Sequence, residues 1–76
     1  MVIKDIKGIE IKIGQIVKSK QPIGGFLPPA PAKIGEVCYK KFNNGIFLCI
    51  KYREEGQVFD RHITLQGKIN EVLEDT

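Results

Sequence analysis

The sequence predicts a small, mostly β domain in which five short strands curl into a barrel. Three neighbouring β-rich runs carry this prediction: residues 34–42 (IGEVCYKKF), 46–53 (IFLCIKYR) and 57–65 (QVFDRHITL). Turn signals separate them, because Asn-Asn-Gly follows the first run and Glu-Glu-Gly follows the second. Asn-Gly between two β-rich runs is the strongest short-range signal for a hairpin. The runs therefore predict an antiparallel meander.

The amino-terminal part of the chain predicts another strand. Residues 9–13 alternate apolar and charged side chains as Ile-Glu-Ile-Lys-Ile, and a period of two is typical of a half-buried strand. Gly14 would then bend the chain, and residues 16–18 would continue the strand.

Residues 19–33 (SKQPIGGFLPPAPAK) hold all four prolines of the chain and predict a long loop. Proline removes backbone donors, which excludes a central strand and favours an extended or polyproline-like segment. Apolar side chains are unexpected in a solvated loop, so we interpret those of this segment as a surface that binds a protein partner or a second copy of the chain. The residues of this predicted surface are Ile23, Phe26, Leu27, Pro28 and Pro31.

The same segment contains a possible polyproline ligand. Residues 28–33 match a Pro-x-x-Pro-x-basic pattern, which a polyproline helix presents to the aromatic grooves of SH3-type domains. The alternative is that the prolines stiffen a long loop and lower its loss of entropy on folding.

The end of the chain fits either a strand or one helical turn. Gln66-Gly67 closes the meander, and the spacing of Ile69 and Leu73 suits both elements. We expect a final strand that pairs near the amino terminus, because this pairing would remove an exposed sheet edge. A short carboxy-terminal helical turn is the alternative.

Alternation within the meander predicts which side chains face the core. In the middle run one face is apolar throughout, with Ile46, Leu48, Ile50 and Tyr52. The other face is apolar near the turn, at Phe47 and Cys49, and we expect the Phe26-Leu27 part of the loop to cover it. The expected inward residues of the third run are Phe59, Ile63 and Leu65, with Arg61 as an exception that would mark a bulge.

Length and composition describe one ordinary domain. The chain has 76 residues, of which 42% are hydrophobic and 28% are charged. No apolar run approaches the ~20 residues that a membrane-spanning helix needs. The charged amino terminus is unlike a signal peptide, so we expect a cytoplasmic protein. A domain this short has a small core, which favours self-association as a source of stability.

The charge of +3 is unevenly spread. Residues 1–68 hold all twelve basic side chains and six of the nine acids, a balance of +6. A basic body can attract nucleic acid or an acidic partner, and the alternative is a solvated lysine-rich surface. Tyr39 and Tyr52 could add the aromatic rings on which single-stranded nucleic acid stacks. The predicted nucleic-acid surface consists of Lys18, Lys20, Lys40, Lys41, Lys51 and Arg53.

Residues with catalytic or metal-binding potential are few. A four-residue connection would place Cys38 opposite Cys49, whereas a three-residue connection would place it opposite Ile50. We expect two thiols, because reducing compartments rarely keep structural disulfides. His62 has Asp60 on the same strand face, but it lacks the spacing of a nucleophilic or zinc site and is more simply a partly exposed strand residue. We therefore expect no enzyme, no cofactor and no metal.

The chain resembles the SH3-like barrels of small bacterial and phage-borne proteins. The opening KDIKGIEIKIGQIVKSK fits their Gly-x-x-Ile-x-x-Gly-x-x-Val entry at Gly8, Ile11, Gly14 and Val17. The later GEVCYKKFNNGIFLCIKY resembles their Gly-x-Val strand and hairpin from Gly35 onward. This resemblance implies a five-stranded SH3-like barrel, and fold alone does not imply function. The leading interpretation is a small non-enzymatic binding module, and the alternative is a nucleic-acid-binding barrel.

Overall fold

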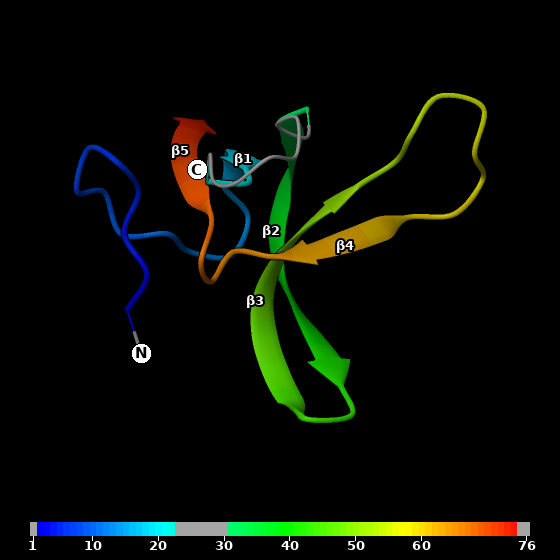
Figure 1. Ribbon diagram of the computed structural model, residues 1–76, viewed down its shortest axis with the longest axis horizontal. Helices are drawn as coiled ribbons and strands as arrows, with labels where there is room; N and C mark the ends of the chain where they lie inside the picture. Colours follow the sequence, from blue (N-terminus) through cyan, green and yellow to red (C-terminus); the bar gives the residue numbers. More distant parts are fainter. Residues whose placement is uncertain (1, 23–30, 75–76) are drawn as a thin grey trace.

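The computed structural model describes residues 2–22 and 31–74, which form one antiparallel sheet of five strands (Figure 1). The strands are β1 (Ile16–Lys20), β2 (Lys33–Phe42), β3 (Gly45–Tyr52), β4 (Arg61–Thr64) and β5 (Ile69–Glu74). Their order is β4-β3-β2-β1-β5, so the last strand pairs with the first. The mostly β prediction is confirmed. The strands at the two ends of this order, β4 and β5, form no ladder with each other among the described residues. The sheet is therefore not closed into a barrel.

The end of the chain is a strand, as expected, and the alternative of a helical turn is wrong. Residues 69–74 pair with β1 from Lys20↔Ile69 to Val17↔Val72, with a register shift near Ile16. Across residues 2–22 and 31–74 there is no helix, and hence none long and apolar enough to cross a membrane.

The β2–β3 hairpin has the register of the four-residue connection. Phe42 faces Gly45 and Cys38 faces Cys49, as that connection requires. Gly45 has a φ of 138°, a backbone conformation that L side chains rarely adopt, so glycine is needed where the chain returns into β3.

The predicted strand over residues 9–13 is wrong. Within it Glu10 alone takes part in a β-bridge, and that bridge is isolated. The Gln15 side chain binds this backbone instead: its Oε1 accepts from the N–H of Lys12 (2.7 Å) and its Nε2 donates to the C=O of Glu10 (3.2 Å). A side chain that satisfies the backbone locally competes with a strand ladder. Residues 2–13 form an irregular segment, the amino-terminal arm.

The third strand of the meander is shorter than predicted, because β4 begins only at Arg61. Phe59, which was expected to face the core, is 77% exposed. Polar contacts hold this segment as a loop: Arg53 Nη2 lies 3.1 Å from Asp60 Oδ1, and Arg61 Nε donates to Gln57 Oε1 (2.9 Å). Arg61 pairs regularly with Tyr52, so it marks no bulge.

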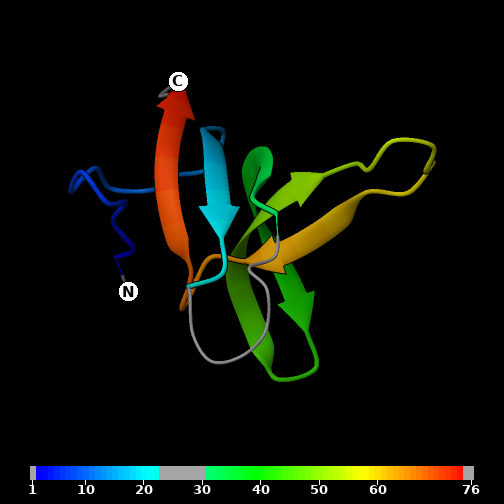
Figure 2. The same ribbon diagram turned by 45° about the horizontal axis from the view of Figure 1, so that its top comes forward.

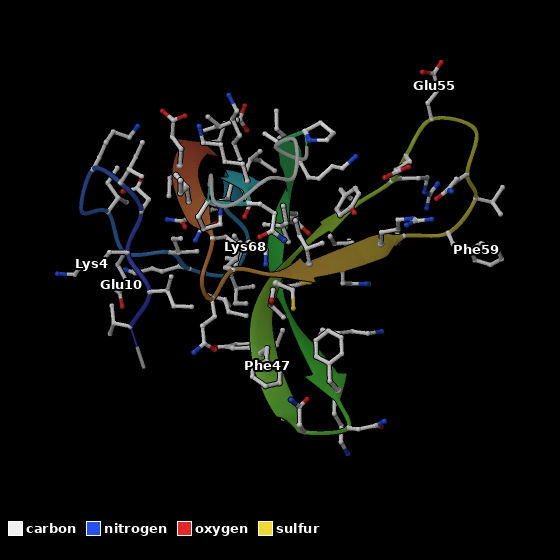
Figure 3. All side chains as sticks on the ribbon, in the orientation of Figure 1. Lys4, Glu10, Phe47, Glu55, Phe59 and Lys68 are labelled. Carbon is white, nitrogen blue, oxygen red and sulfur yellow. The ribbon has the colours of Figure 1, made fainter. Side chains whose placement is uncertain are left out.

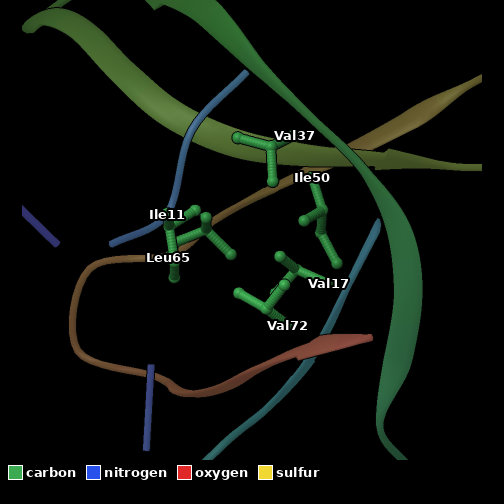
Figure 4. Packing of buried hydrophobic residues seen from close by; sticks show 6 residues of the cluster. All are labelled: Ile11, Val17, Val37, Ile50, Leu65 and Val72. Carbon is green, nitrogen blue, oxygen red and sulfur yellow. The ribbon is translucent and has the colours of Figure 1, made fainter. Parts of the chain in front are cut away.

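The core lies where the two halves of the sheet face each other (Figure 4). Ile63 and Leu65 face it as predicted, Leu65 being fully buried and Ile63 packed against the buried cluster. The buried cluster is Ile11, Val17, Val37, Ile50, Leu65 and Val72. Because residues of β3 and β5 belong to one cluster although three ladders separate them, the sheet must curl strongly.

The amino-terminal arm covers the outer edge of β5. Asp5 is buried, and its Oδ1 accepts from the N–H groups of Lys7 (2.9 Å) and Ile9 (2.8 Å). Its Oδ2 accepts from the N–H of Val72 (3.0 Å), while the N–H of Ile6 donates to the C=O of Asn70 (3.0 Å). The edge strand is thus paired with the arm instead of being open to another chain.

We predict that Gly35→Ala destabilises the fold. A Cβ at Gly35 would overlap the carbonyl of Lys51 on β3, which is backbone and cannot move aside easily. Overpacking of this kind costs about 1–3 kcal/mol, so the free energy of unfolding in urea should fall by that amount. The control is Ile34→Ala at the exposed neighbouring position, which should change stability by less than about 0.5 kcal/mol. Equal stability of the two variants would contradict this packing.

We predict that Asp5 stabilises the fold at neutral pH and ceases to do so in acid. Burial raises the pKa of Asp5, but hydrogen bonds from the backbone of Val72, Ile9 and Lys7 outweigh this effect and hold the pKa below its ordinary value of 3.8. Because the folded pKa is the lower one, the contribution is complete above the unfolded pKa and is lost as pH falls through the folded pKa. Urea unfolding of the wild type and Asp5→Asn should therefore differ clearly at pH 7, and the difference should shrink as pH falls below 3.8. A difference independent of pH would contradict an ionised Asp5.

Candidate functional site

The β2–β3 hairpin projects beyond the rest of the sheet (Figures 1 and 2). The ladder between β1 and β2 ends at Glu36, and the ladder between β3 and β4 begins at Cys49. The outer part of the hairpin, residues 38–48, is therefore a two-stranded ribbon with little support on either side. Among the described residues, it receives a further backbone hydrogen bond from the N–H of Leu65 to the C=O of Leu48 (3.0 Å).

One face of the ribbon continues the core face but is open to solvent. Tyr39 and Ile46 are 67% and 66% exposed, and Leu48 lies directly across from Tyr39. These three residues form the hairpin patch. They line a hollow of about 270 Å³ together with Ile3 of the arm, Phe47 and Gln66. Exposed apolar patches with a polar rim are typical of interaction sites.

The opposite face of the ribbon carries an aromatic pair. The ring centroids of Phe42 and Phe47 lie 5.8 Å apart with an interplanar angle of 54°. Figure 3 shows Phe47 on this hairpin, away from the central crossing of the strands. Both rings line a second hollow of about 340 Å³, which Asn44 and Thr64 also border. The hairpin is therefore apolar on both faces.

The backbone along the outer edge of β2 has unused hydrogen-bonding groups. Val37 uses its N–H and C=O toward the first strand, to Gln15 (2.9 Å) and Gly14 (3.1 Å). Because strand residues alternate, the N–H and C=O of Tyr39 and Lys41 point the same way, where the described part of the chain offers them no partner. On the edge of β3, the N–H and C=O of Ile46 likewise point outward, away from the partner strand.

The ribbon is basic. Between residues 37 and 53 the sequence contains no Asp or Glu. Lys40 and Lys41 point to opposite faces of β2, and neither has an ion-pair partner among the described residues. Lys51 faces Glu36 across the sheet, so it lies beside a compensating acid.

The structure does not bring the predicted nucleic-acid residues into one surface. Lys18, Lys20, Lys40 and Lys51 share the outer face of the sheet by register, whereas Lys41 lies on the other face. Arg53 is bound to Asp60 in the loop after β3. The predicted stacking partners Tyr39 and Tyr52 lie on the core face, opposite Lys40 and Lys51.

A different basic site gathers at the other end of the core. Lys20, Lys33 and Lys68 line a hollow of about 190 Å³ whose apolar walls include Tyr52 and Ile63. Lys33 Nζ lies 5.6 Å from the ring centroid of Tyr52 and 3.1 Å from Oε1 of Glu54. That hydrogen bond lowers the pKa of Glu54. Within the described ranges Lys20 and Lys68 have no acidic partner.

The predicted docking loop lies mostly outside the described residues. Ile23, Phe26, Leu27 and Pro28 belong to residues 23–30, and so does the expected cover of the Phe47 face. Pro31 is exposed and borders the hollow of Lys20, Lys33 and Lys68.

The cysteines and the histidine do not combine into a reactive centre. Cys38 and Cys49 face each other as free thiols. Burial raises the pKa of the Cys49 thiol, and the neighbouring Cys38 raises it further. His62 is half-buried and faces Lys51, while Asp60 binds Arg53 instead. Residues 2–22 and 31–74 hold no group of three His, Cys, Asp or Glu side chains that could bind a metal.

Sequence reasoning placed Ile46 and Leu48 on the apolar, core-facing side of the middle run and Tyr39 among the stacking residues of a basic surface, and it did not predict that the three form one patch. The signal that could have revealed their exposure is strand length. The two strands of the hairpin have 10 and 8 residues, whereas their neighbours β1 and β4 have 5 and 4. Long strands between short ones must extend beyond them.

A comparison with protein-family models, with curated proteins and with solved structures found no match for this chain. The site is therefore interpreted from its own geometry and charge.

Proposed function

We propose that this chain is a small non-enzymatic binding module whose docking site is the projecting β2–β3 hairpin. The observation that carries the proposal is the exposure of Tyr39 and Ile46 on adjacent strands, beside backbone groups that have no partner in the described residues. Covering a large apolar side chain contributes about 1.5–3 kcal/mol, and aromatic anchors dominate protein interfaces. The docking surface lies on the hairpin instead of depending on the proline-rich loop alone.

We also propose that the strongly curled sheet is an SH3-like barrel that stays open between β4 and β5. The strand order supports this, since the first strand lies between β2 and β5 and a long segment separates β1 from β2. The shared core of β3 and β5 residues supports it too, because only a strongly curled sheet brings those strands together. A projecting hairpin on such a scaffold is rigid at its base and accessible at its end.

The second candidate function is binding of single-stranded nucleic acid at the hollow beside Tyr52. Three lysines border this hollow, and an aromatic ring lies among them. Charge for phosphates and a ring for stacking are what such ligands require. The competing feature is Glu54, which already neutralises Lys33. This candidate replaces the dispersed set that the sequence predicted.

We predict that Tyr39→Thr and Ile46→Thr weaken binding of a protein ligand by about tenfold or more each, because each removes an apolar anchor. Threonine keeps the strand propensity, so the hairpin should remain folded. The ligands would be peptides selected from a random library against the wild type, with affinity measured by calorimetry. Self-association would be followed by light scattering at low and high salt.

The matched control is Phe59→Thr, which removes an equally exposed aromatic ring from the loop between β3 and β4. We expect this variant to bind like the wild type. If Phe59→Thr weakened binding and the hairpin variants did not, the docking site would be the loop, and the proposal would be wrong.

We predict that any oligonucleotide binding falls steeply with salt, because phosphate contacts release counterions. In titrations with single-stranded oligonucleotides, Lys68→Gln should weaken binding and lower the slope of log K against log salt by about 0.7. Lys51→Gln on the outer face is the control, and it should leave the affinity and the salt slope unchanged. Absence of measurable binding at low salt would remove this candidate.

A further inference from the structure

We infer that an extended acidic segment of a partner protein adds as a further strand along the free edge of β2, pairing with Tyr39 and Lys41. This inference rests on the proposed function and specifies the ligand of the same hairpin. It follows from three properties of the edge: unused backbone groups, an apolar contact for one side chain, and unpaired positive charge on both faces.

The edge of β2 is the longest uncovered edge among the described strands. The arm covers β5 through Asp5 and Ile6. The strand at the other end of the sheet, β4, has 4 residues, and short edge strands pair poorly. On the hairpin, the edge of β3 offers the outward groups of Ile46, whereas β2 offers those of both Tyr39 and Lys41. Strand addition uses main-chain bonds of this kind for affinity.

Side chains beside this edge define which residues the added strand needs. Tyr39 is 67% exposed on the core face. An apolar side chain opposite Tyr39 would cover its ring. Lys41 shares the face of Tyr39, and Lys40 points to the opposite face, so acids at two successive positions of the added strand would face one lysine each.

Charge argues for an acidic partner and against a second copy of the same edge. If two copies paired through their β2 edges, both Lys40–Lys41 pairs would lie on neighbouring strands with no acid between them. Like charges on facing strands destabilise the pairing. An acidic strand turns the same lysines into attractive contacts and is also attracted from a distance by the basic ribbon.

The test uses a labelled peptide, Thr-Val-Glu-Glu-Val-Thr, titrated into ¹⁵N-labelled protein and followed by NMR. Its core reads the same in both directions, so it probes parallel and antiparallel pairing. We expect the largest shifts at the amides of Tyr39 and Lys41, and no binding of the charge-reversed peptide Thr-Val-Lys-Lys-Val-Thr. Absence of hairpin shifts with the acidic peptide, or equal binding of the two peptides, would overturn the inference.

Two variants of one position separate strand pairing from charge. Lys41→Thr and Lys41→Pro both remove the positive charge, but proline also removes the outward N–H. Proline is tolerated in edge strands where the N–H faces away from the sheet, and circular dichroism would verify folding. We expect Lys41→Pro to bind about tenfold more weakly than Lys41→Thr, the loss typical of a blocked main-chain bond. A peptide N-methylated at its glutamates provides the same test on the unaltered protein, and it should bind as weakly.

The outcomes distinguish this inference from the proposed function. If Lys41→Pro and Lys41→Thr bound equally while Tyr39→Thr still lost binding, the hairpin would be a docking site that acts through side chains, and strand addition would be wrong. If Ile46→Pro but not Lys41→Pro abolished binding, the added strand would lie along β3. If light scattering gave a dimer that Lys41→Pro dissociated, the occupant would be a second copy, which also overturns the acidic partner.

Discussion

The carboxylate of Asp5 is the interaction on which the arrangement of this domain depends. It accepts three backbone N–H groups, two from its own turn and one from Val72 of the last strand. Hydrogen bonds to the ionised form outweigh the cost of burial, which is why the pKa of Asp5 is lowered in a buried place. By joining the arm to β5, the carboxylate removes one edge of the sheet from competition for partners. Strand length then decides which other parts of the sheet edge remain uncovered.

Strand length leaves the hairpin outside the core. The buried cluster extends along β3 only as far as Ile50, and the outer ends of β2 and β3 form no ladder with a third strand among the described residues. In a chain of 76 residues with four Phe and two Tyr, three of these rings (Tyr39, Phe42 and Phe47) lie on this ribbon. A small domain buries too little surface to leave aromatic side chains outside its core without cost. Their position is understandable if a partner covers them.

How much of this could be predicted depends on whether a signal is local. The hairpin itself followed from the turn residues, although they left its register open between a three-residue and a four-residue connection, and the pairing of residues 69–74 followed from the need to cover an edge. The prediction of a strand over residues 9–13 was wrong. Alternation shows which side chains are apolar, but it does not show that Gln15 binds the backbone of Lys12 and Glu10. The prediction that Phe59 faces the core was wrong for a similar reason, because alternation does not record that Arg53 pairs with Asp60 in the loop before β4.

The candidate site shows the same division between local and distant signals. Residues 38–42 and 46–48 of the ribbon were predicted as strand and residues 43–45 as the turn between them, and the lysines were predicted as a basic set. Whether these residues are exposed depends on where the neighbouring strands β1 and β4 end. That is a property of β1 and β4 and not of the hairpin itself. For this reason Tyr39 was paired in the prediction with Lys40 and Lys51, although the pleat places it on the other face.

Lys40 and Lys41 counteract the unspecific association that the exposed apolar side chains of the ribbon would otherwise favour. A flat edge flanked by Tyr39 and Ile46 would pair with any strand it met, and lysine on an edge strand is a common protection against such pairing. Because the two lysines point to opposite faces, they repel a basic strand whichever face it presents, and covering them with a neutral strand costs their desolvation. The same repulsion becomes attraction for a strand with two successive acids. Under the inferred strand addition, the two charged residues would both oppose unspecific association and select the partner, without any change in the backbone that would do the binding.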